Sequence, residues 1–286
     1  MSAAVIGVDV GGTTVKAVAV ADGRIVAELR RPTPSPDPTG SGVVETVADA
    51  VAGLTPSPEA PVGVVVPGIV DEARGVAVHA ANLGWRDVPL RRLLGERLGR
   101  EVAFGHDVRA GALAEARLGA ARAAEGVVAF VPIGTGIAAA LLVDGRPIAS
   151  DGWAGEIGQP LIAHGPHAGR RVEEIASAAG TAARAGLPDA RAVVERVRAG
   201  DPASVAVWRD TVDVLADALT SLVAAVSPRT VVLGGGLALA GDTLLVPLAD
   251  ALRARMGQLR PPRLVTAALG DRAAALGAAL LATDGP

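Results

Sequence analysis

Asp9-Val10-Gly11-Gly12-Thr13-Thr14-Val15-Lys16 is the stretch that decides the fold, because it separates two strand-like runs instead of a strand from a helix. The β-branched, mostly apolar run 3–10 leads into it, and Val15–Val20 continues from it. A third run, Arg24–Arg30, follows an Asp-Gly turn signal. We therefore expect three antiparallel strands at the start of the chain.

The residue types of this first loop suit a phosphate group. Glycines let a tight turn bring backbone N–H groups against an anionic oxygen, hydroxyls add donors, and a carboxylate can hold a metal-bound water near a phosphate. The candidate nucleotide-binding residues here are Asp9, Gly11, Gly12, Thr13, Thr14 and Lys16. An ordinary hairpin turn with a solvated lysine is the alternative interpretation.

The middle of the chain repeats this architecture in pattern, although not in identity. A strand is expected over Val127–Ile133 and another over Ile137–Val143, with the loop Gly134-Thr135-Gly136 between them. The Thr135 hydroxyl could bind a β- or γ-phosphate oxygen. Two such loops in equivalent positions indicate phosphate binding better than either one does.

Strands and helices alternate along the rest of the chain. Further strands are expected over Pro61–Val66, Val102–Phe104, Thr230–Leu233 and Arg263–Thr266. Helices are expected over Val43–Leu54, Val88–Leu98, Val108–Leu118, Thr243–Met256 and Arg272–Leu281, with a helical region from Val172 to about Ala225 and a loop carrying Asn82 and Trp85. This alternation predicts two α/β lobes facing a cleft, 1–118 and 119–271, with the helix in 272–286 packed on the first lobe.

Composition excludes several classes of protein. The 286 residues contain no cysteine, which removes disulfides, thiolate catalysis and cysteine-ligated metal sites. No apolar run approaches the length of a membrane span, and the N-terminus lacks the pattern of a signal peptide. A net charge of −3 with interspersed Arg, Asp and Glu offers no basic face for nucleic acid. We expect a cytoplasmic protein that binds neither membrane nor nucleic acid.

Two further motifs each have a structural alternative. Gly234-Gly235-Gly236 follows a buried strand and precedes a helix, which suits a flat ligand such as adenosine but also suits close strand–helix packing. Asp107 stands at the mouth of a helix that begins near Val108, where it could be an N-cap or a general base for an attacking hydroxyl.

Taken in order, the motifs resemble those of the repressor, open reading frame, kinase (ROK) family. The matching motifs are Asp9–Lys16, Pro67-Gly68, Asn82-Leu83-Gly84-Trp85, Asp107, Gly134-Thr135-Gly136, Gly155-Glu156-Ile157-Gly158 and Gly234-Gly235-Gly236. They span nearly the whole chain. The resemblance implies the hexokinase- and actin-like fold, with two ribonuclease-H-like lobes around a central cleft, ATP and Mg²⁺ between the lobes, a hexose deep in the cleft and a homodimer.

The resemblance also implies the roles of individual residues. Asp107 resembles the catalytic base for the sugar 6-hydroxyl. The residues that resemble sugar ligands are Gly68, Asn82, His106, Asp107, Glu156, Gln159 and Glu173. Glu174 could stand in for Glu173, but Glu173 is preferred because the segment from it to Ala176-Ser177 resembles the family's segment. Surface charges are the alternative for Glu156 and Glu173.

Three departures from the family bear on the substrate. His106 replaces the usual Asn, Gln159 replaces the usual His, and the cysteine-rich zinc segment is replaced by the loop Pro160–Val172. A structural zinc is therefore not expected. His164 and His167 in this loop are two histidines without a third ligand nearby, so we expect exposed polar loop residues and no metal site.

The sequence thus predicts an ATP-dependent kinase for the 6-hydroxyl of a hexose, with glucose as the default substrate. A kinase for an amino sugar, such as kanosamine or N-acetylglucosamine, is the second possibility. A sugar-responsive repressor would need a DNA-binding domain ahead of Asp9, for which we expect no room. A catalytically silent sensor is disfavoured because Asp107 and both phosphate loops are present.

Overall fold

The structure of the chain is a computed structural model that describes residues 4–54, 57 and 59–284. Residue 3, from the predicted strand 3–10, and residues 285–286, from the predicted C-terminal segment 272–286, lie outside the described residues. The chain folds into two compact units. Unit 1 comprises the described parts of Met1–Ala114, Pro147–Ala154 and Asp271–Pro286, and unit 2 comprises Glu115–Arg146 and Gly155–Gly270.

Unit 1 is built on a five-stranded sheet with the strand order β3-β2-β1-β4-β8. The strands are β1 (Val5–Val10), β2 (Thr14–Ala21), β3 (Arg24–Pro32), β4 (Val62–Val66) and β8 (Val102–His106). β2 runs antiparallel to β1 and β3, as the glycine turn predicted, whereas β1, β4 and β8 run parallel. The three parallel strands therefore end at the same edge of the sheet.

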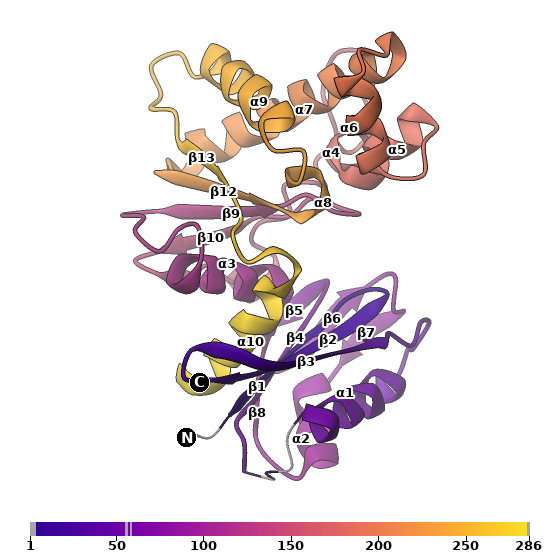
Figure 1. Ribbon diagram of the computed structural model, residues 1–286, viewed down its shortest axis with the longest axis vertical. Helices are drawn as coiled ribbons and strands as arrows, with labels where there is room; N and C mark the ends of the chain where they lie inside the picture. Colours follow the sequence, from indigo (N-terminus) through magenta and orange to yellow (C-terminus); the bar gives the residue numbers. More distant parts are fainter. Residues whose placement is uncertain (1–3, 55–56, 58, 285–286) are drawn as a thin grey trace. The chain divides into compact units, whose positions relative to one another are not determined.

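Helices cover both faces of this sheet (Figure 1). Successive side chains of a strand face opposite sides, and Ile6 and Val8 share a core with α1 (Ser41–Leu54) and α2 (Leu90–Leu98). The positions between them face α10 (Ala273–Asp284), because a Cβ on Gly7 would collide with the backbone of Ala275. Glycine on β1 is therefore what lets α10 lie directly on the sheet.

A small three-stranded sheet lies where the sequence predicted a loop. It consists of β5 (Ile69–Asp71), β6 (Val76–Ala80) and β7 (Trp85–Val88), all antiparallel. The loop prediction was wrong for Trp85, which is fully buried and donates from Nε1 to the carbonyl of Asp37 at 2.9 Å. β7 has the exposed Arg86 and Asp87 between its buried ends, so it shows neither a continuous apolar run nor a period of two.

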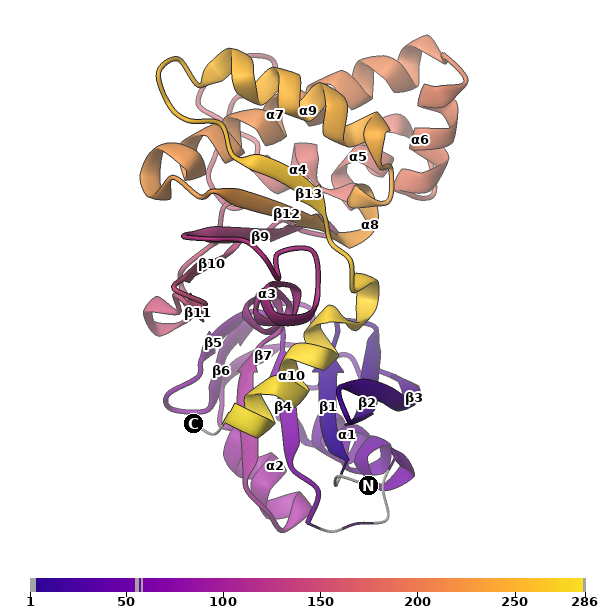
Figure 2. The same ribbon diagram turned by 60° about the vertical axis from the view of Figure 1, so that its left-hand side comes forward.

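Unit 2 has a second five-stranded sheet with the order β11-β10-β9-β12-β13, covered by helices (Figure 2). Its strands are β9 (Val128–Pro132), β10 (Ala140–Val143), β11 (Arg146–Pro147), β12 (Thr230–Gly234) and β13 (Arg263–Thr266). β9, β12 and β13 are parallel. The predicted strand Ile137–Val143 is shorter than expected, because Ile137 forms only an isolated bridge with Ile133.

The predicted helical region from Val172 is divided by its capping residues. It contains α4 (Val172–Ala176), α5 (Ala178–Ala185), α6 (Ala190–Arg198) and α7 (Pro202–Val226). Asp189 and Asp201 each accept a backbone N–H in the first turn of the next helix, as N-caps do. The remaining elements are α3 (Asp107–Leu118), α8 (Gly235–Ala238), α9 (Asp242–Arg255) and the 3₁₀ turns η1 (Ser150–Gly152) and η2 (Gly270–Arg272). Among the described residues, no helix is long and apolar enough to cross a membrane.

Candidate active site

The parallel register of unit 1 brings motifs from distant parts of the sequence to one sheet edge. Asp9 on β1 lies opposite Val65 on β4, and Val66 lies opposite His106 at the end of β8. The glycine hairpin after β1, Gly68 after β4 and Asp107 after β8 therefore leave the sheet at the same edge. Ligands of open α/β sheets bind at the carboxyl ends of strands, so this edge is the candidate site in unit 1.

The first glycine loop is a closed turn held from outside by the following proline-rich segment. Gly11 donates to the carbonyl of Thr14 at 3.0 Å, and the Thr33 hydroxyl donates to the carbonyl of Gly11 at 2.7 Å. Neither Gly11 nor Gly12 has a positive φ. A Cβ at position 12 would collide with Nδ2 of Asn82, so any larger residue there would displace the Asn82 side chain.

The loop that carries Asn82 is held by the same proline-rich segment. The carbonyl of Asn82 accepts from the Ser35 hydroxyl at 2.7 Å, and the carbonyl of Leu83 accepts from the Asp37 N–H at 3.0 Å. The predicted sugar ligand Asn82 and the predicted phosphate loop therefore lie side by side in unit 1. Gly68 has φ +92° and a Cβ there would collide with the backbone of the same small sheet, so this turn requires glycine.

Asp9 is a buried carboxylate with one cationic neighbour. It lies directly across β1 and β2 from Lys16, whose Nζ is 3.6 Å from Oδ2 of Asp9 and donates to the carbonyl of Asp271 at 3.3 Å. Burial raises the pKa of Asp9 to about 6, although Lys16 opposes this rise. A carboxylate whose charge is only partly compensated in this way is suited to interact with a further cation.

Asp107 is the first residue of α3 and lies beside a buried histidine. Nε2 of His106 is 3.2 Å from Oδ1 of Asp107, and Oδ1 also accepts from the N–H of Val108 at 2.7 Å. An N-cap accepts from the N–H two or three residues ahead, so the contact with Val108 is not a capping bond. Burial, together with the charge of Arg109, lowers the pKa of His106 to about 3. His106 is therefore neutral at physiological pH.

Sequence reasoning missed two charged residues that adjoin this pair. Oε1 of Glu72 accepts from the backbone N–H of His106 and from Nε of Arg109, both at 2.9 Å. Arg109 is only 2% exposed. The available signal was a single arginine inside the otherwise small and apolar run Val108–Ala114, since a charged residue is seldom buried unless it is paired.

In unit 2 the two remaining glycine motifs lie at the ends of neighbouring parallel strands. The N–H of Ile133, next to Gly134, donates to the carbonyl of Gly234 at 2.9 Å, and its carbonyl accepts from Leu237 at 3.1 Å. A Cβ on Gly134 would have no heavy atom within 4 Å, whereas Gly235 has φ +75° and lies against the backbone of Ile133. Gly235 thus has a structural reason to be glycine, whereas the space at Gly134 is open for a ligand.

The predicted sugar-binding segment of unit 2 adjoins the second phosphate loop. A Cβ on Gly136 would lie 2.7 Å from Oε2 of Glu173, and the backbone N–H of Glu173 donates to Gly158 at 3.0 Å. Nε2 of Gln159 donates to Oε1 of Glu173 at 2.9 Å. Glu156 lies three residues before Gln159, in the turn whose Gln159 N–H donates to the Glu156 carbonyl at 3.1 Å.

Glu173 and Glu174 have different surroundings. Glu174 accepts from the backbone N–H of Arg171 at 2.7 Å and pairs with Arg170 at 3.4 Å, so it is engaged at the start of its own helix. Glu173 instead faces Gly136 and Gln159. This difference supports the choice of Glu173 as the candidate ligand, a choice that remains a prediction.

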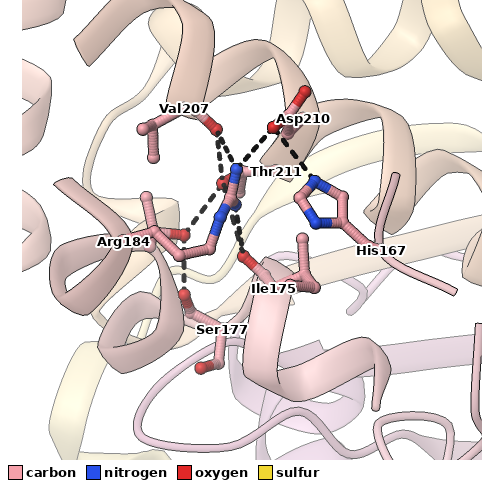
Figure 3. Close-up of polar contacts among 8 residues, drawn as sticks. His167, Ile175, Ser177, Arg184, Val207, Asp210 and Thr211 are labelled. Carbon is pink, nitrogen blue, oxygen red and sulfur yellow. Dashed lines mark hydrogen bonds and ion pairs between the residues drawn. The ribbon is translucent and has the colours of Figure 1, made fainter. Parts of the chain in front are cut away.

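The loop Pro160–Val172 is anchored on α7 by a polar cluster (Figure 3). Nε2 of His167 lies 3.0 Å from Oδ2 of Asp210, which also accepts from Arg184 at 2.7 Å. Arg184 donates to the carbonyl of Ile175 at 3.0 Å, which ties α4 to the cluster. Both histidines were expected to be exposed. That is wrong for His167, which is partly buried, and right for His164.

The cluster contains no arrangement typical of a metal centre. Within the described part of the chain, no group of three or more His, Asp or Glu side chains is placed to hold a metal ion. His167 has a carboxylate and a guanidinium in its neighbourhood, and these are the partners of a polar anchor. The expectation that the protein lacks structural zinc remains a prediction.

Comparisons with known proteins agree on one family and one fold. The ROK family model matches residues 5–285. A glucokinase of Halalkalibacterium halodurans is 31% identical over 278 residues, covering 85% of this chain and 83% of that protein. The N-acetylgalactosamine kinase AgaK of Shewanella sp. is 28% identical over 305 residues, covering 96% of this chain and 95% of that protein.

A solved structure matches nearly the whole chain. The ROK family glucokinase of Streptomyces griseus, in complex with glucose and AMPPNP, superposes with a TM-score of 0.85 at 27% sequence identity. The match covers 99% of this chain and 100% of that one. The predicted α/β fold class is thereby confirmed.

Proposed function

Because the chain belongs to the ROK family, we propose that it is an ATP-dependent kinase that phosphorylates the 6-hydroxyl of a hexose, with glucose as the default substrate. The observation that carries this proposal is the edge of the unit 1 sheet, where the glycine hairpin after β1 and the carboxylate of Asp107 after β8 leave two parallel strands that both pair with β4. A base for a hydroxyl and a loop for a phosphate are the two parts that phosphoryl transfer requires.

In the proposed reaction, Asp107 accepts the proton of the sugar 6-hydroxyl while O6 forms a bond to the γ-phosphorus of ATP. The bond from that phosphorus to the bridging oxygen breaks, and ADP leaves with the electron pair. We propose that neutral His106, whose Nε2 lies 3.2 Å from Oδ1, orients the carboxylate. We propose that Asn82, Glu156, Gln159 and Glu173 bind the sugar hydroxyls, since each offers oxygen acceptors, and that the glycine loops bind ATP.

Mg²⁺ fits the residues present if ATP supplies most of its ligands. A Mg²⁺ ion usually keeps several waters and binds through one or two carboxylates and the substrate phosphates, and Asp9 is a buried carboxylate beside the first glycine loop. When bound, the ion would neutralise charge on the transferred phosphate. Asp9 would hold one of its waters, and Lys16 would keep Asp9 oriented.

A kinase for an amino sugar is the second candidate, and a specific observation favours it. Nδ1 of His106 is buried and has no hydrogen-bond partner, and in a neutral imidazole that donates from Nε2 this atom is an acceptor. We propose that sugar binding uncovers this buried atom and that a sugar amine or amide then supplies the missing donor. AgaK, named as an N-acetylgalactosamine kinase, is a relative of this chain.

The test is a coupled assay of ADP release with glucose, mannose, glucosamine, kanosamine and the N-acetylhexosamines. We expect phosphorylation of at least one sugar, and a fall in kcat of at least about 10² in Asp107→Asn, which keeps the shape but cannot take the proton. Asp49→Asn, on the exposed face of α1, is the matched control and should keep full activity. Full activity of Asp107→Asn would rule out the mechanism.

We also propose a homodimer, from the family resemblance, and a cytoplasmic protein that binds no nucleic acid, from the charge and the N-terminal sequence. Light scattering after size-exclusion chromatography would determine the mass in solution against the 28.4 kDa of one chain. A mass of one chain at micromolar concentration would contradict the dimer.

In the ADP-release assay, binding of glucose without release of ADP would indicate a sensor and not a kinase.

A further inference from the structure

We propose that Arg109, held in place by Glu72, is a positioning residue that fixes His106 and, through His106, the carboxylate of Asp107. This inference rests on the proposed function, since it assigns a task to residues that support the proposed base. It starts from geometry that the sequence motifs do not include.

Glu72 connects two segments that the sheet alone leaves separate. It follows β5, and its Oε1 accepts from the backbone N–H of His106 at the end of β8 and from Nε of Arg109 on α3. Nη2 of Arg109 donates to the carbonyl of Val70 on β5 at 3.0 Å. The guanidinium therefore bonds both the Glu72 carboxylate and the Val70 carbonyl. These bonds tie the junction of β8 and α3, which carries Asp107, to β5.

The Glu72–Arg109 pair acts on both the backbone position and the protonation of His106. The charged groups that face His106 are Asp107 and Arg109 on α3 and Glu72 after β5. The Arg109 charge adds to burial in keeping the imidazole neutral, and Nε2 of this imidazole lies 3.2 Å from Oδ1 of Asp107. An imidazolium at this place would hold the negative charge of Asp107 in an ion pair and make it a poorer proton acceptor.

Burial makes the arrangement sensitive to change. Nη1 of Arg109 and Nδ1 of His106 are both buried without a partner, a state that structures seldom tolerate away from functional sites. A lysine at position 109 would keep the positive charge, but its single ammonium cannot span Glu72 and Val70 in the way that the planar guanidinium does. Arg109→Lys therefore tests the positioning role of the guanidinium, whereas Arg109→Gln removes the positive charge as well.

The first experiment follows the histidines by NMR in the wild type, Arg109→Gln and Arg109→Lys. The chain has four histidines, and the signal of His106 is identified by its loss in His106→Asn. We expect the wild-type imidazole to remain neutral from about pH 8 to about pH 5. Arg109→Gln should raise the pKa of His106 towards that range, because Glu72 and Asp107 then face it without the guanidinium, although burial, the larger cause of the low pKa, remains. Arg109→Lys keeps the positive charge and should leave the pKa as low as in the wild type.

The second experiment measures kcat and the sugar KM of the same variants. We expect both Arg109→Gln and Arg109→Lys to lower kcat about tenfold or more, with a smaller change in the sugar KM, because the misplaced group acts in the chemical step. Arg24→Gln, at an exposed position of β3, is the control and should leave both constants unchanged. Glu72→Gln keeps an oxygen acceptor for both donors, so it should lower kcat less than either Arg109 variant.

Three results would overturn the proposal. One is a folded Arg109→Lys with wild-type kcat, another is a wild-type His106 that titrates near its ordinary pKa, and the third is an Arg109→Gln in which the pKa of His106 does not rise above that of the wild type. If Arg109→Gln does not fold, Arg109→Lys and Glu72→Gln still decide the kinetic part. If no sugar is phosphorylated, the proposed function fails, whereas the NMR titration still tests the contact of Arg109 with His106.

Discussion

Replacing Asp9 with asparagine should stabilise the folded protein at neutral pH while abolishing ATP turnover. Asp9 is 6% exposed, and burial raises its pKa from 3.8 to about 6. The folded chain therefore holds a proton on Asp9 more tightly than the unfolded chain does. Ionising Asp9 in the folded state destabilises the protein, and asparagine removes that destabilisation.

The size and pH dependence of the effect follow from this pKa difference. Each pKa unit corresponds to about 1.4 kcal/mol, so raising the pKa from 3.8 to about 6 is worth about 3 kcal/mol of unfolding free energy. In the wild type, the protonated Asp9 contributes this stability of about 3 kcal/mol in full below pH 3.8. The contribution is lost as the pH rises through about 6, where Asp9 ionises in the folded state. Asparagine still offers an oxygen to Lys16, so the variant should gain most of this amount.

Urea denaturation of the wild type and Asp9→Asn between about pH 4 and about pH 8 measures the difference. We expect Asp9→Asn to be more stable by about 2–3 kcal/mol at pH 8, with the gain shrinking towards zero near pH 4. Asp49→Asn on the surface of α1 is the control and should differ little from the wild type at any pH. A gain that is absent at pH 8, or that does not shrink in acid, would refute the buried, destabilising carboxylate.

Three other expectations concern the ligands. Gly134→Ala should leave stability unchanged, because the added Cβ meets no protein atom, but it should raise the ATP KM by filling space proposed for a phosphate. Gly12→Ala should weaken the binding of both substrates, because it displaces Asn82. Folded variants with wild-type ATP kinetics would exclude the assignment of these loops to phosphate. Elemental analysis should find no stoichiometric zinc, and activity should require added Mg²⁺; one zinc per chain would contradict this. His106→Asn should shift the kcat/KM ratio between an amino sugar and glucose towards glucose by about tenfold, since an unpaired buried polar group is penalised; an unchanged ratio would mean that His106 does not recognise the sugar.

Local patterns in the sequence were enough to predict most helices and strands of the fold. The glycine turn after Asp9 predicted the antiparallel pairing of β1 and β2, because a turn of this length can only reverse the chain. The apolar runs that became β4, β8 and β12 were recognisable because strands buried on both faces are continuously hydrophobic. The small sheet β5-β6-β7 escaped because its strands are not continuous apolar runs: β7, for example, has the exposed Arg86 and Asp87 between its buried ends.

The sequence by itself determined which residues are candidates for the site: a carboxylate at Asp107, a histidine before it, and glycines in the two loops proposed to bind phosphate. Only the tertiary structure decided that Glu72 and Arg109 join this group. Their hydrogen bonds reach across 34 and 37 positions of the chain. Local sequence patterns carry information about neighbours within one turn or one strand, whereas the protonation of His106 depends on burial and on charges that arrive from other elements.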